Sequence, residues 1–327
     1  QLFPTVAETL RCGGRKLAVD GVVIIAEHGE YPTNEKGQKL YPRARIFGEV
    51  VKVFEQDKRA VPVFNDKHLS YSFSKAQAMV SASRRLDFPL LAGSSLPVTW
   101  RMPEMEVPYG CRIKEALAVG VGSLDSSGFH ALEALQCLVE RRRGGETGIR
   151  RVQLLEGPAV WRAREKERWS PKLLEAALSR ADVIKGLTLV DARPQDLTSP
   201  GLLEQIVPRP AAFLIEYRDG LKATLLMLNG AVGDFTAAVR VKDHPRLLST
   251  KFLLPPDPNV AYSACLTHQI EQMIVNRKAP YPVERTLLVS GLLESALDSR
   301  FQGQRRLRTR HLDVEYQAPQ ESQYCRI

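Results

Sequence analysis

The sequence predicts an α/β chain in two parts, a small parallel sheet covered by helices and then an α+β region with an open, mainly antiparallel sheet flanked by helices. Three observations support this prediction. Apolar runs alternate with amphipathic helical patterns over residues 1–93, which is typical of β-α-β units. Prolines then punctuate Trp100–Pro108, as in a linker. Beyond this stretch, longer strand-like segments follow one another. We place the division between residues 1–98 and 99–327.

Three strands, with helices before and between them, are expected in the first part. Leu17–Ala26 is almost continuously apolar, which predicts a strand buried on both faces. Apolar residues at i, i+4 and i+8 from Ile46 predict a helix of about 17 residues after a loop over 31–42. The other expected elements are helices over 4–11 and 72–86, and short strands at Val61–Phe64 and Phe88–Ala92.

This order of elements is half of a doubly wound nucleotide-binding sheet with right-handed crossovers. No G-x-G-x-x-G opens a helix in the sequence, so the usual phosphate-cradling turn is missing from it. An apolar strand at an open sheet edge also invites aggregation. We therefore expect about two or three further strands before Gln1 in the natural protein, or a partner that covers the edge beside Leu17–Ala26.

The second part is expected to contain six strands and four helices. Asp219-Gly220 predicts a tight hairpin turn, and Ser170-Pro171 predicts a helix start. The predicted strands are Glu115–Val121, Ile149–Leu155, Ile184–Val190, Ala211–Tyr217, Ala223–Leu228 and Phe235–Val241, and the predicted helices are 126–143, 170–181, 262–277 and 283–299. The tail after Arg300 has little pattern. Because open antiparallel sheets often leave one face to be covered, we expect a homo-oligomer.

The composition, 44% hydrophobic and 25% charged, is that of an ordinary globular protein. No apolar run is long enough to span a membrane, and no signal peptide opens the chain. The five cysteines are scattered and never spaced C-x-x-C, which predicts reduced thiols, a cytoplasmic location and no structural zinc. They are Cys12, Cys111, Cys137, Cys265 and Cys325.

The net charge of +9 raises the question of nucleic-acid binding. The basic runs Arg141–Arg143 and Arg305–Arg310 are short and lack interleaved aromatic residues. We interpret them as solvated faces or as a preference for anionic substrates. We therefore expect a small-molecule substrate and no nucleic-acid partner.

Polar residues follow each strand of the predicted parallel sheet. Asn65, Asp66, Lys67 and His68 follow the central strand, and ligands of open parallel sheets bind beyond the carboxyl ends of the strands. The flanking strands end in Glu27 and His28 on one side and in Ser94 and Ser95 on the other. Glu27, His28 and Glu30 are poorly spaced for a metal, so we predict none. The alternative for the whole set is a group of solvated loops.

Two side chains are candidates for acid–base chemistry. A lysine in a partly desolvated cleft can hydrogen-bond a substrate hydroxyl, and Lys67 fits this role unless it is a surface lysine paired with an acid. His130 lies near a predicted helix start, where the pKa of an imidazole is lowered, although a buried core histidine is the alternative. Candidates for substrate contact are Ser94, Ser95, Trp100 and Arg101, with Tyr262 and His268 as weaker ones. Arg101 could instead form a structural ion pair.

Four segments resemble the glucose–fructose oxidoreductase / inositol dehydrogenase (Gfo/Idh/MocA) family, over most of the chain from Leu17 to about residue 310. Leu17–Ala26 resembles the family's D-x-V-x-I-A-T strand. Phe64–Leu69 occupies the place of its E-K-P motif, with Lys67 as the lysine. Gly128–Glu133 resembles its G-x-H-x-x-D helix start, and Arg285–Ala296 its C-terminal helix ending in E-S-A.

The resemblance implies a Rossmann domain, a second domain with an open sheet, and hydride transfer between a nicotinamide cofactor (NAD or NADP) and an often sugar-like or polyol hydroxyl. It implies that Lys67 and His130 act at that hydroxyl. Asp66 and His68 stand where the family has Glu and Pro. Ser126 stands at the usual acidic position, with Asp125 beside it as the candidate acid.

Two classes of function therefore remain open. The first is an oxidoreductase with Lys67, His130 and Asp125 as catalytic residues and with Glu27, His28, Asn65 and Asp66 beside the cofactor. The second is a ligand-binding or structural protein that keeps the fold without redox chemistry, as the missing glycine-rich turn suggests. A lyase or hydrolase that uses the same lysine and histidine is a third alternative.

Overall fold

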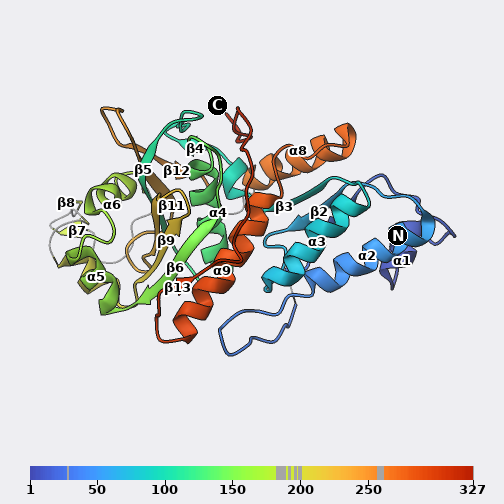
Figure 1. Cartoon of the computed structure of the whole chain (residues 1–327), viewed down its shortest axis with the longest axis horizontal. Coiled ribbons are helices and arrows are strands. Elements are labelled where there is room, and N and C mark those ends of the chain that lie inside the picture. Colours follow the sequence, from blue (N-terminus) through green and yellow to red (C-terminus); the bar gives the residue numbers. More distant parts are fainter. Residues whose placement is uncertain are drawn as a thin grey trace.

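A computed structural model describes residues 1–27, 29–181, 189–190, 193–194, 197, 201–255 and 261–326. Two sheets organise these residues (Figure 1). A three-stranded sheet lies toward the N-terminal end of the molecule, and an eight-stranded sheet lies at the other end. The predicted combination of a small parallel sheet and a larger, mainly antiparallel sheet is confirmed.

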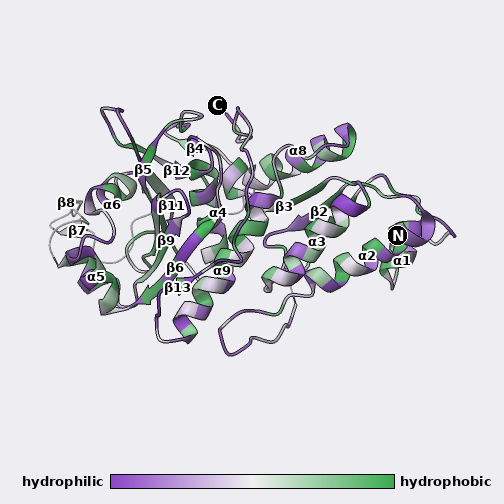
Figure 2. Ribbon diagram, in the orientation of Figure 1, coloured by the Kyte–Doolittle hydropathy of each residue, from purple (hydrophilic) through white to green (hydrophobic). Residues whose placement is uncertain are grey.

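The first sheet has the order β1-β2-β3, and all its strands are parallel. Helices α2 and α3 form the two crossovers, and their apolar faces are buried against the sheet while their polar faces point outward (Figure 2). The elements are α1 (Val6–Arg11), β1 (Val22–Ile24), α2 (Arg43–Asp57), β2 (Val63–Asp66), α3 (Phe73–Arg85) and β3 (Leu90–Gly93).

Strand β1 differs from its prediction in length and in burial. It is three residues long, and the side chain of Val23 is 48% exposed. Phe64 and Leu91, which share its row in the sheet, are buried under helix α8 (Ala261–Asn276). Helix α8 reaches Gly21, directly before β1, through Ile274 but leaves Val23 half exposed, so burial on both faces was the wrong prediction for this strand. Among the described residues, β1 pairs only with β2.

Helix α8 comes from beyond residue 98 but packs on the first sheet. Its Met273 and Cys265 form a small core with Phe64, Leu91 and the 3-10 helix η1 (Leu96–Val98). Figure 1 shows α8 next to β2 and β3 rather than over the larger sheet. The division at residue 98 stays a prediction.

Cys265 of α8 is joined by a disulfide to Cys325 in the C-terminal tail. The prediction of five reduced thiols was therefore wrong for this pair. The backbone N–H of Cys325 donates to the carbonyl of Val98 in η1, which packs against α8. Cysteine spacing in the sequence does not predict this contact. The other three cysteines are free thiols. The cellular compartment stays a prediction.

The second sheet has the order β13-β6-β9-β10-β5-β11-β12-β4, antiparallel except for the β5–β10 pair. Its strands are β4 (Arg101–Met102), β5 (Ile113–Gly120), β6 (Ile149–Glu156), β9 (Ala211–Tyr217), β10 (Lys222–Met227), β11 (Phe235–Val241), β12 (Leu248–Phe252) and β13 (Leu307–Arg308). Its helices are α4 (Ser126–Val139), α5 (Pro158–Glu165), α6 (Pro171–Leu178), α7 (Leu202–Ile206) and α9 (Glu284–Phe301). A separate pair, β7 (Leu189–Val190) and β8 (Arg193–Pro194), includes the end of the predicted strand Ile184–Val190, of which residues 184–188 lie outside the described residues.

Both faces of this sheet carry helices. Along β5, Ala116 and Ala118 pack in the core that contains α4 and α9, whereas Leu117 and Val119 pack in the core that contains α5 and α6. The argument for oligomerisation through a bare sheet face therefore does not apply at this strand. A homo-oligomer stays a prediction.

Two stretches expected to lack sheet structure contribute edge strands. Arg101 and Met102 of the expected linker form β4, which pairs with β12. Leu307 and Arg308 of the patternless tail form β13, which pairs with β6. Two-residue strands carry too little periodicity to be seen in a sequence, and the pairing surface of the larger sheet determines them.

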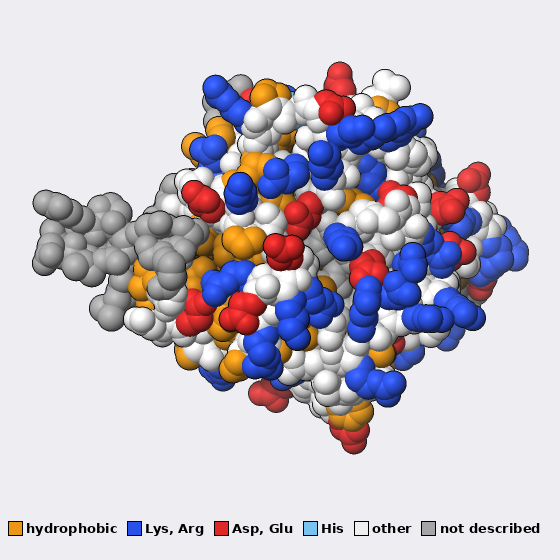
Figure 3. All heavy atoms as spheres, turned by 60° about the vertical axis from the view of Figure 1, so that its left-hand side comes forward, with side chains coloured by type: hydrophobic (Ala, Val, Ile, Leu, Met, Phe, Trp, Pro, Cys, Tyr) orange, Lys and Arg blue, Asp and Glu red, His pale blue; other side chains and the backbone are white. Residues whose placement is uncertain are grey.

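Part of the positive charge is structural. Arg141 and Arg142 are buried, where Arg141 bonds backbone carbonyls and Glu106, and Arg142 pairs with Glu146. Their interpretation as a solvated face was wrong, because the chain folds over them. Basic and acidic side chains are interspersed on the face shown in Figure 3. Within the described part of the chain, no helix is long and apolar enough to cross a membrane.

Candidate functional site

A cavity of about 290 Å³ lies beyond the carboxyl ends of β2 and β3, between the first sheet, α4 and α8. It brings together several residues that the sequence singled out, among them Lys67, His130 and Tyr262. The full lining is Asp66, Lys67, Ser95, Leu96, His130, Phe235, Leu254, Tyr262, Ser263 and Leu266.

Lys67 is held at the end of β2 in an unusual backbone conformation. Its φ of 62° lies in the left-handed region, which costs a residue other than glycine about 1 kcal/mol or more. Its N–H donates to the carbonyl of Gly93 at 3.1 Å, so pairing with the end of β3 maintains this conformation. The amine lies 2.8 Å from a carboxylate oxygen of Asp66 and 3.5 Å from one of Glu27. The lysine head is thus positioned by the sheet and by two acids.

His130 lies in the second turn of α4, and its Nδ1 is 2.6 Å from the hydroxyl oxygen of Ser94. That oxygen also accepts a hydrogen bond from the N–H of Leu96. Burial, and then the nearby charge of Lys67, lower the pKa of His130 to about 4. The imidazole is therefore neutral near pH 7, and Ser94 fixes its orientation.

Glu133, one turn beyond His130, is 1% exposed. Its carboxylate accepts hydrogen bonds from the N–H of Ser94 at 3.2 Å and from the hydroxyl of Thr286 at 2.8 Å. Only glycine fits at position 93, because a Cβ there would lie 2.5 Å from a Glu133 oxygen and the φ of Gly93 is +127°. Burial raises the pKa of Glu133 to about 7. This acid therefore supports Ser94, and Ser94 supports His130.

Because burial raises the pKa of Glu133, wild-type stability should depend on pH through this group. The folded state holds the proton more tightly than the unfolded state, so the contribution is present below pH 4.5 and is lost as the pH rises to about 7. We expect the unfolding free energy of the wild type, relative to Glu133→Gln, to fall by about 3 kcal/mol between pH 4.5 and 8. Urea unfolding at several pH values measures this difference.

The low pKa of His130 changes the free energy of unfolding in the opposite direction. Because unfolding takes up a proton between about pH 6.5 and 4, this contribution to stability is lost as the pH falls. This contribution is common to both proteins and cancels in the comparison. A free-energy difference that stays constant from pH 4.5 to 8 would contradict the role of burial at Glu133.

A second polar cluster lies behind Lys67. The guanidinium of Arg43 is buried, pairs with Glu27 at 2.7 Å and stacks on the ring of Tyr41 at 4.0 Å. It also lies 2.7 Å from Nδ1 of His68. Burial and then the charge of Arg43 lower the pKa of His68 well below its usual value, so His68 is a neutral buried partner of Arg43. His68, at the position that the sequence resemblance compares with a proline, thus belongs to this cluster.

Several predicted site residues lie near the cavity without lining it. Glu27 faces Arg43 and Lys67, Ser94 acts through His130, and Asn65 is completely buried with its amide donating to the carbonyl of His68. Asp125 is the N-cap residue of α4 and accepts a hydrogen bond from the N–H of Lys39, and burial raises its pKa. These residues support the site rather than form its wall.

Other predicted residues lie elsewhere. Arg101 is buried among the carbonyl of Met105, the thiol of Cys137 and the ring of Tyr324, so its placement agrees with a structural role and not with substrate contact. Trp100 packs beside the α8 core, and His268 is exposed on α8 outside the cavity wall. His28 lies outside the described residues. Among the residues that are described, no group of three His, Cys, Asp or Glu could hold a metal ion.

Some functional neighbours were missed at the level of sequence. Phe235, Leu254 and Leu266 give the cavity an apolar side and are indistinguishable from core residues in the sequence. Arg43 offered a signal, because a cation in the first turn of a helix is disfavoured by the helix dipole, by up to about 1 kcal/mol, and is stabilised by an acidic partner. That partner is Glu27.

Solved structures with a similar fold include an NAD complex and two inositol dehydrogenases. GenD2 from gentamicin A biosynthesis, in complex with NAD, superposes with a TM-score of 0.57 at 14% identity, over 94% of this chain and 82% of that one. The apo scyllo-inositol dehydrogenase from Lactobacillus casei gives 0.52 at 9% identity over 94% and 82%. The myo-inositol 2-dehydrogenase from Lactobacillus plantarum gives 0.51 at 10% identity over 94% and 84%.

At these identities the similarity establishes the fold. The chain has the two-part architecture of these proteins, a Rossmann-like sheet followed by a larger, mainly antiparallel sheet. No protein-family model matches the sequence, and no curated protein matches it.

Proposed function

We propose that the protein is an oxidoreductase that acts on a hydroxyl group of a sugar-like or polyol substrate, with a nicotinamide cofactor. The observation that supports this proposal best is that Lys67 and His130, from the two parts of the chain, line one cavity at the carboxyl ends of parallel strands. The fold shared with inositol dehydrogenases and with the NAD-bound GenD2 agrees with it.

In this proposal, the two basic side chains have different tasks. The Lys67 ammonium donates a hydrogen bond to the substrate oxygen and stabilises the negative charge that develops there as the proton leaves. With Nδ1–H donating to Ser94, the neutral His130 takes the hydroxyl proton on Nε2. A bound nicotinamide would supply the hydride acceptor. In the reverse direction, His130 returns the proton to the same oxygen.

The polar part of the cavity wall suits a polyhydroxylated substrate. Asp66, Ser95, Tyr262 and Ser263 offer oxygen atoms that can bind the remaining hydroxyl groups. Phe235 and the leucines of the wall exclude water on the other side. No metal ion is needed for this division of roles.

The described residues fit the two ends of the cofactor differently. The cavity, with a cation and a neutral imidazole, suits the nicotinamide end, which Lys67, Ser95 and His130 of its wall would contact. No glycine-rich strand–turn–helix is present among them to cradle a pyrophosphate, and Asn65 and Glu27 already bond within the protein. We therefore assign Lys67, Ser95 and His130 to the reacting end and leave the phosphates unassigned.

A second candidate function is a ligand-binding protein without redox chemistry, because Asn65 and Glu27, expected beside a cofactor, bond within the protein instead. Calorimetric titration of the full chain with NAD, NADH, NADP and NADPH separates the two. We expect saturable heat with one of these pairs. Heat with none of the four would overturn the oxidoreductase proposal, and heat from an inositol alone would then support the second candidate.

A further inference from the structure

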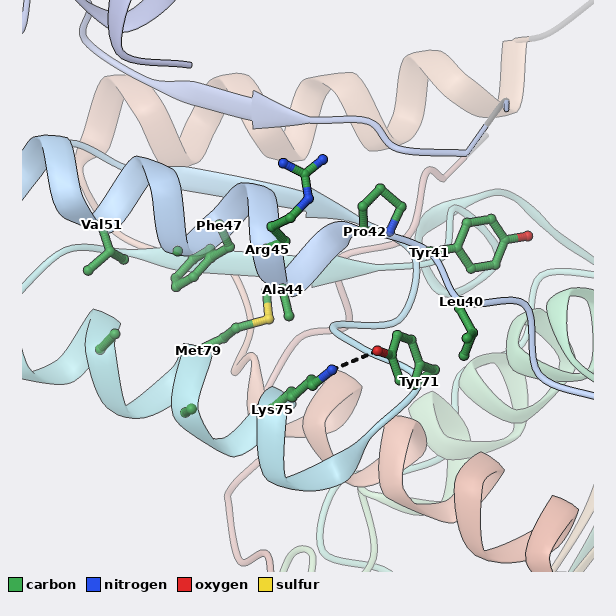
Figure 4. Close-up of a pocket in the computed structure, with 13 residues that line it drawn as sticks. Leu40, Tyr41, Pro42, Ala44, Arg45, Phe47, Val51, Tyr71, Lys75 and Met79 are labelled. Carbon is green, nitrogen blue, oxygen red and sulfur yellow. Dashed lines mark hydrogen bonds between the residues drawn. The ribbon is translucent and has the colours of Figure 1, made fainter. Parts of the chain in front are cut away.

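A groove of about 650 Å³ lies between α2 and α3 (Figure 4). We name it the α2–α3 groove. It shares no lining residue with the cavity that Lys67 and His130 line. Its lining is Leu40, Tyr41, Pro42, Ala44, Arg45, Phe47, Gly48, Val51, Tyr71, Lys75, Ala78, Met79 and Ala82.

Small residues on two facing helices open this groove. Ala44 and Gly48 are one turn apart on α2, and Ala78 and Ala82 are one turn apart on α3. A Cβ at Gly48 would have no neighbouring atom within 4 Å. Large side chains, Phe47, Val51 and Met79, form an apolar floor instead (Figure 4). A volume of this size is in the range of small-molecule sites.

The charge of the groove is one-sided. Lys75 and Arg45 are cations, and no acidic side chain lines it. Arg45 pairs with Glu49 at the rim. The Lys75 amine donates a hydrogen bond to the hydroxyl of Tyr71 at 2.6 Å (Figure 4). In the described residues no carboxylate lies within ion-pair distance of this amine. An anionic group that reaches the Lys75–Tyr71 pair would therefore replace no existing ion pair.

We propose that the α2–α3 groove is a binding site for a monocarboxylate with a straight apolar chain. The wall from Ala44 to Val51, and the facing wall from Lys75 to Ala82, are each about 10 Å long by the helical rise, which matches an acyl chain of about eight to ten carbons. The chain lies along the small residues and over Phe47 and Met79. The carboxylate binds Lys75 and Tyr71 at one end.

Calorimetric titration of the full chain with decanoate, below its micelle concentration, tests this proposal. We expect saturable binding of one decanoate per chain. Gly48→Leu places a side chain in the open space of the groove and should weaken binding at least 10-fold. Gly48→Ala is the matched control, because it adds one methyl group to the same helical position and should retain affinity within about threefold.

Lys75→Met separates the charge from the apolar surface. It should weaken decanoate binding roughly 10-fold and leave the weaker binding of decan-1-ol unchanged. Absence of saturable decanoate binding, or equal binding by wild type and Gly48→Leu, would overturn the proposal. A dimer that Gly48→Leu dissociates, seen by sedimentation, would also overturn it, because the groove would then hold a second copy of the chain.

This site stands independently of the proposed oxidoreductase activity. Lys67→Met should leave decanoate binding unchanged, since Lys67 does not line the groove. No nicotinamide enters the measurement, so loss of one proposal leaves the other in place.

Discussion

Replacement of Arg285 with methionine should lower the free energy of unfolding by about 3–5 kcal/mol. Arg285 lies in the first turn of α9 and makes two hydrogen bonds, at 2.5 and 2.9 Å, to Glu140 at the C-cap of α4. Both side chains are buried. Each charge is at the helix end that disfavours it, so the two charges stabilise each other. Urea or guanidinium unfolding measures the loss.

Glu140 is the reason for this large effect. Without Arg285, the buried carboxylate of Glu140 loses both of these hydrogen bonds. It keeps the hydrogen bond from the hydroxyl of Tyr316. Arg285→Met/Glu140→Leu removes both charges and should recover most of the lost stability. Arg45→Met is the control, since its pair with Glu49 is exposed and should contribute less than about 1 kcal/mol. An Arg285→Met protein as stable as the wild type would contradict this account.

The parts of the fold that the sequence predicts correctly are those with long periodic patterns. The strand Ala211–Tyr217 and the strand Phe235–Val241 occur with the predicted bounds, and the helix capped by Ser170 begins as expected. What could not be predicted depends on contacts between distant segments. The half-exposed Val23 of β1 reflects the incomplete cover that α8 gives this strand, and the edge strands β4 and β13 are too short to show a period.

The same distinction applies to the candidate site. Lys67 and His130 could be located because each follows a recognisable strand end or helix start, and motif order connects them. The role of Glu133 could not be predicted, although it ends the segment Gly128–Glu133, because the sequence does not show that Ser94 and Thr286 donate hydrogen bonds to it. Arg101 was predicted to contact substrate because it is a charged residue at the expected linker, but its side chain is buried.

Replacement of Lys67 with methionine should reduce the rate of hydroxyl oxidation by about 10²–10⁴-fold, if a substrate is found by screening inositols and sugars with NAD and NADP. The methionine side chain matches the apolar part of lysine as far as Cε but cannot donate to the developing oxyanion. His130→Gln should cause a loss of similar size because glutamine cannot take the proton. The double variant should lose little more than either single variant, since both act on one oxygen atom. Steady-state kinetics measures all three.

The backbone at Lys67 supplies the control for folding. Lys67→Gly should keep the wild-type stability, or exceed it, because glycine adopts a φ of 62° without the steric cost that lysine bears. It should nevertheless be as inactive as Lys67→Met. Lys52→Met, at an exposed position of α2, should retain full activity. An active Lys67→Gly protein would show that the amine has no part in the chemistry, whereas a stable and inactive one would show that the strained lysine is retained for its function.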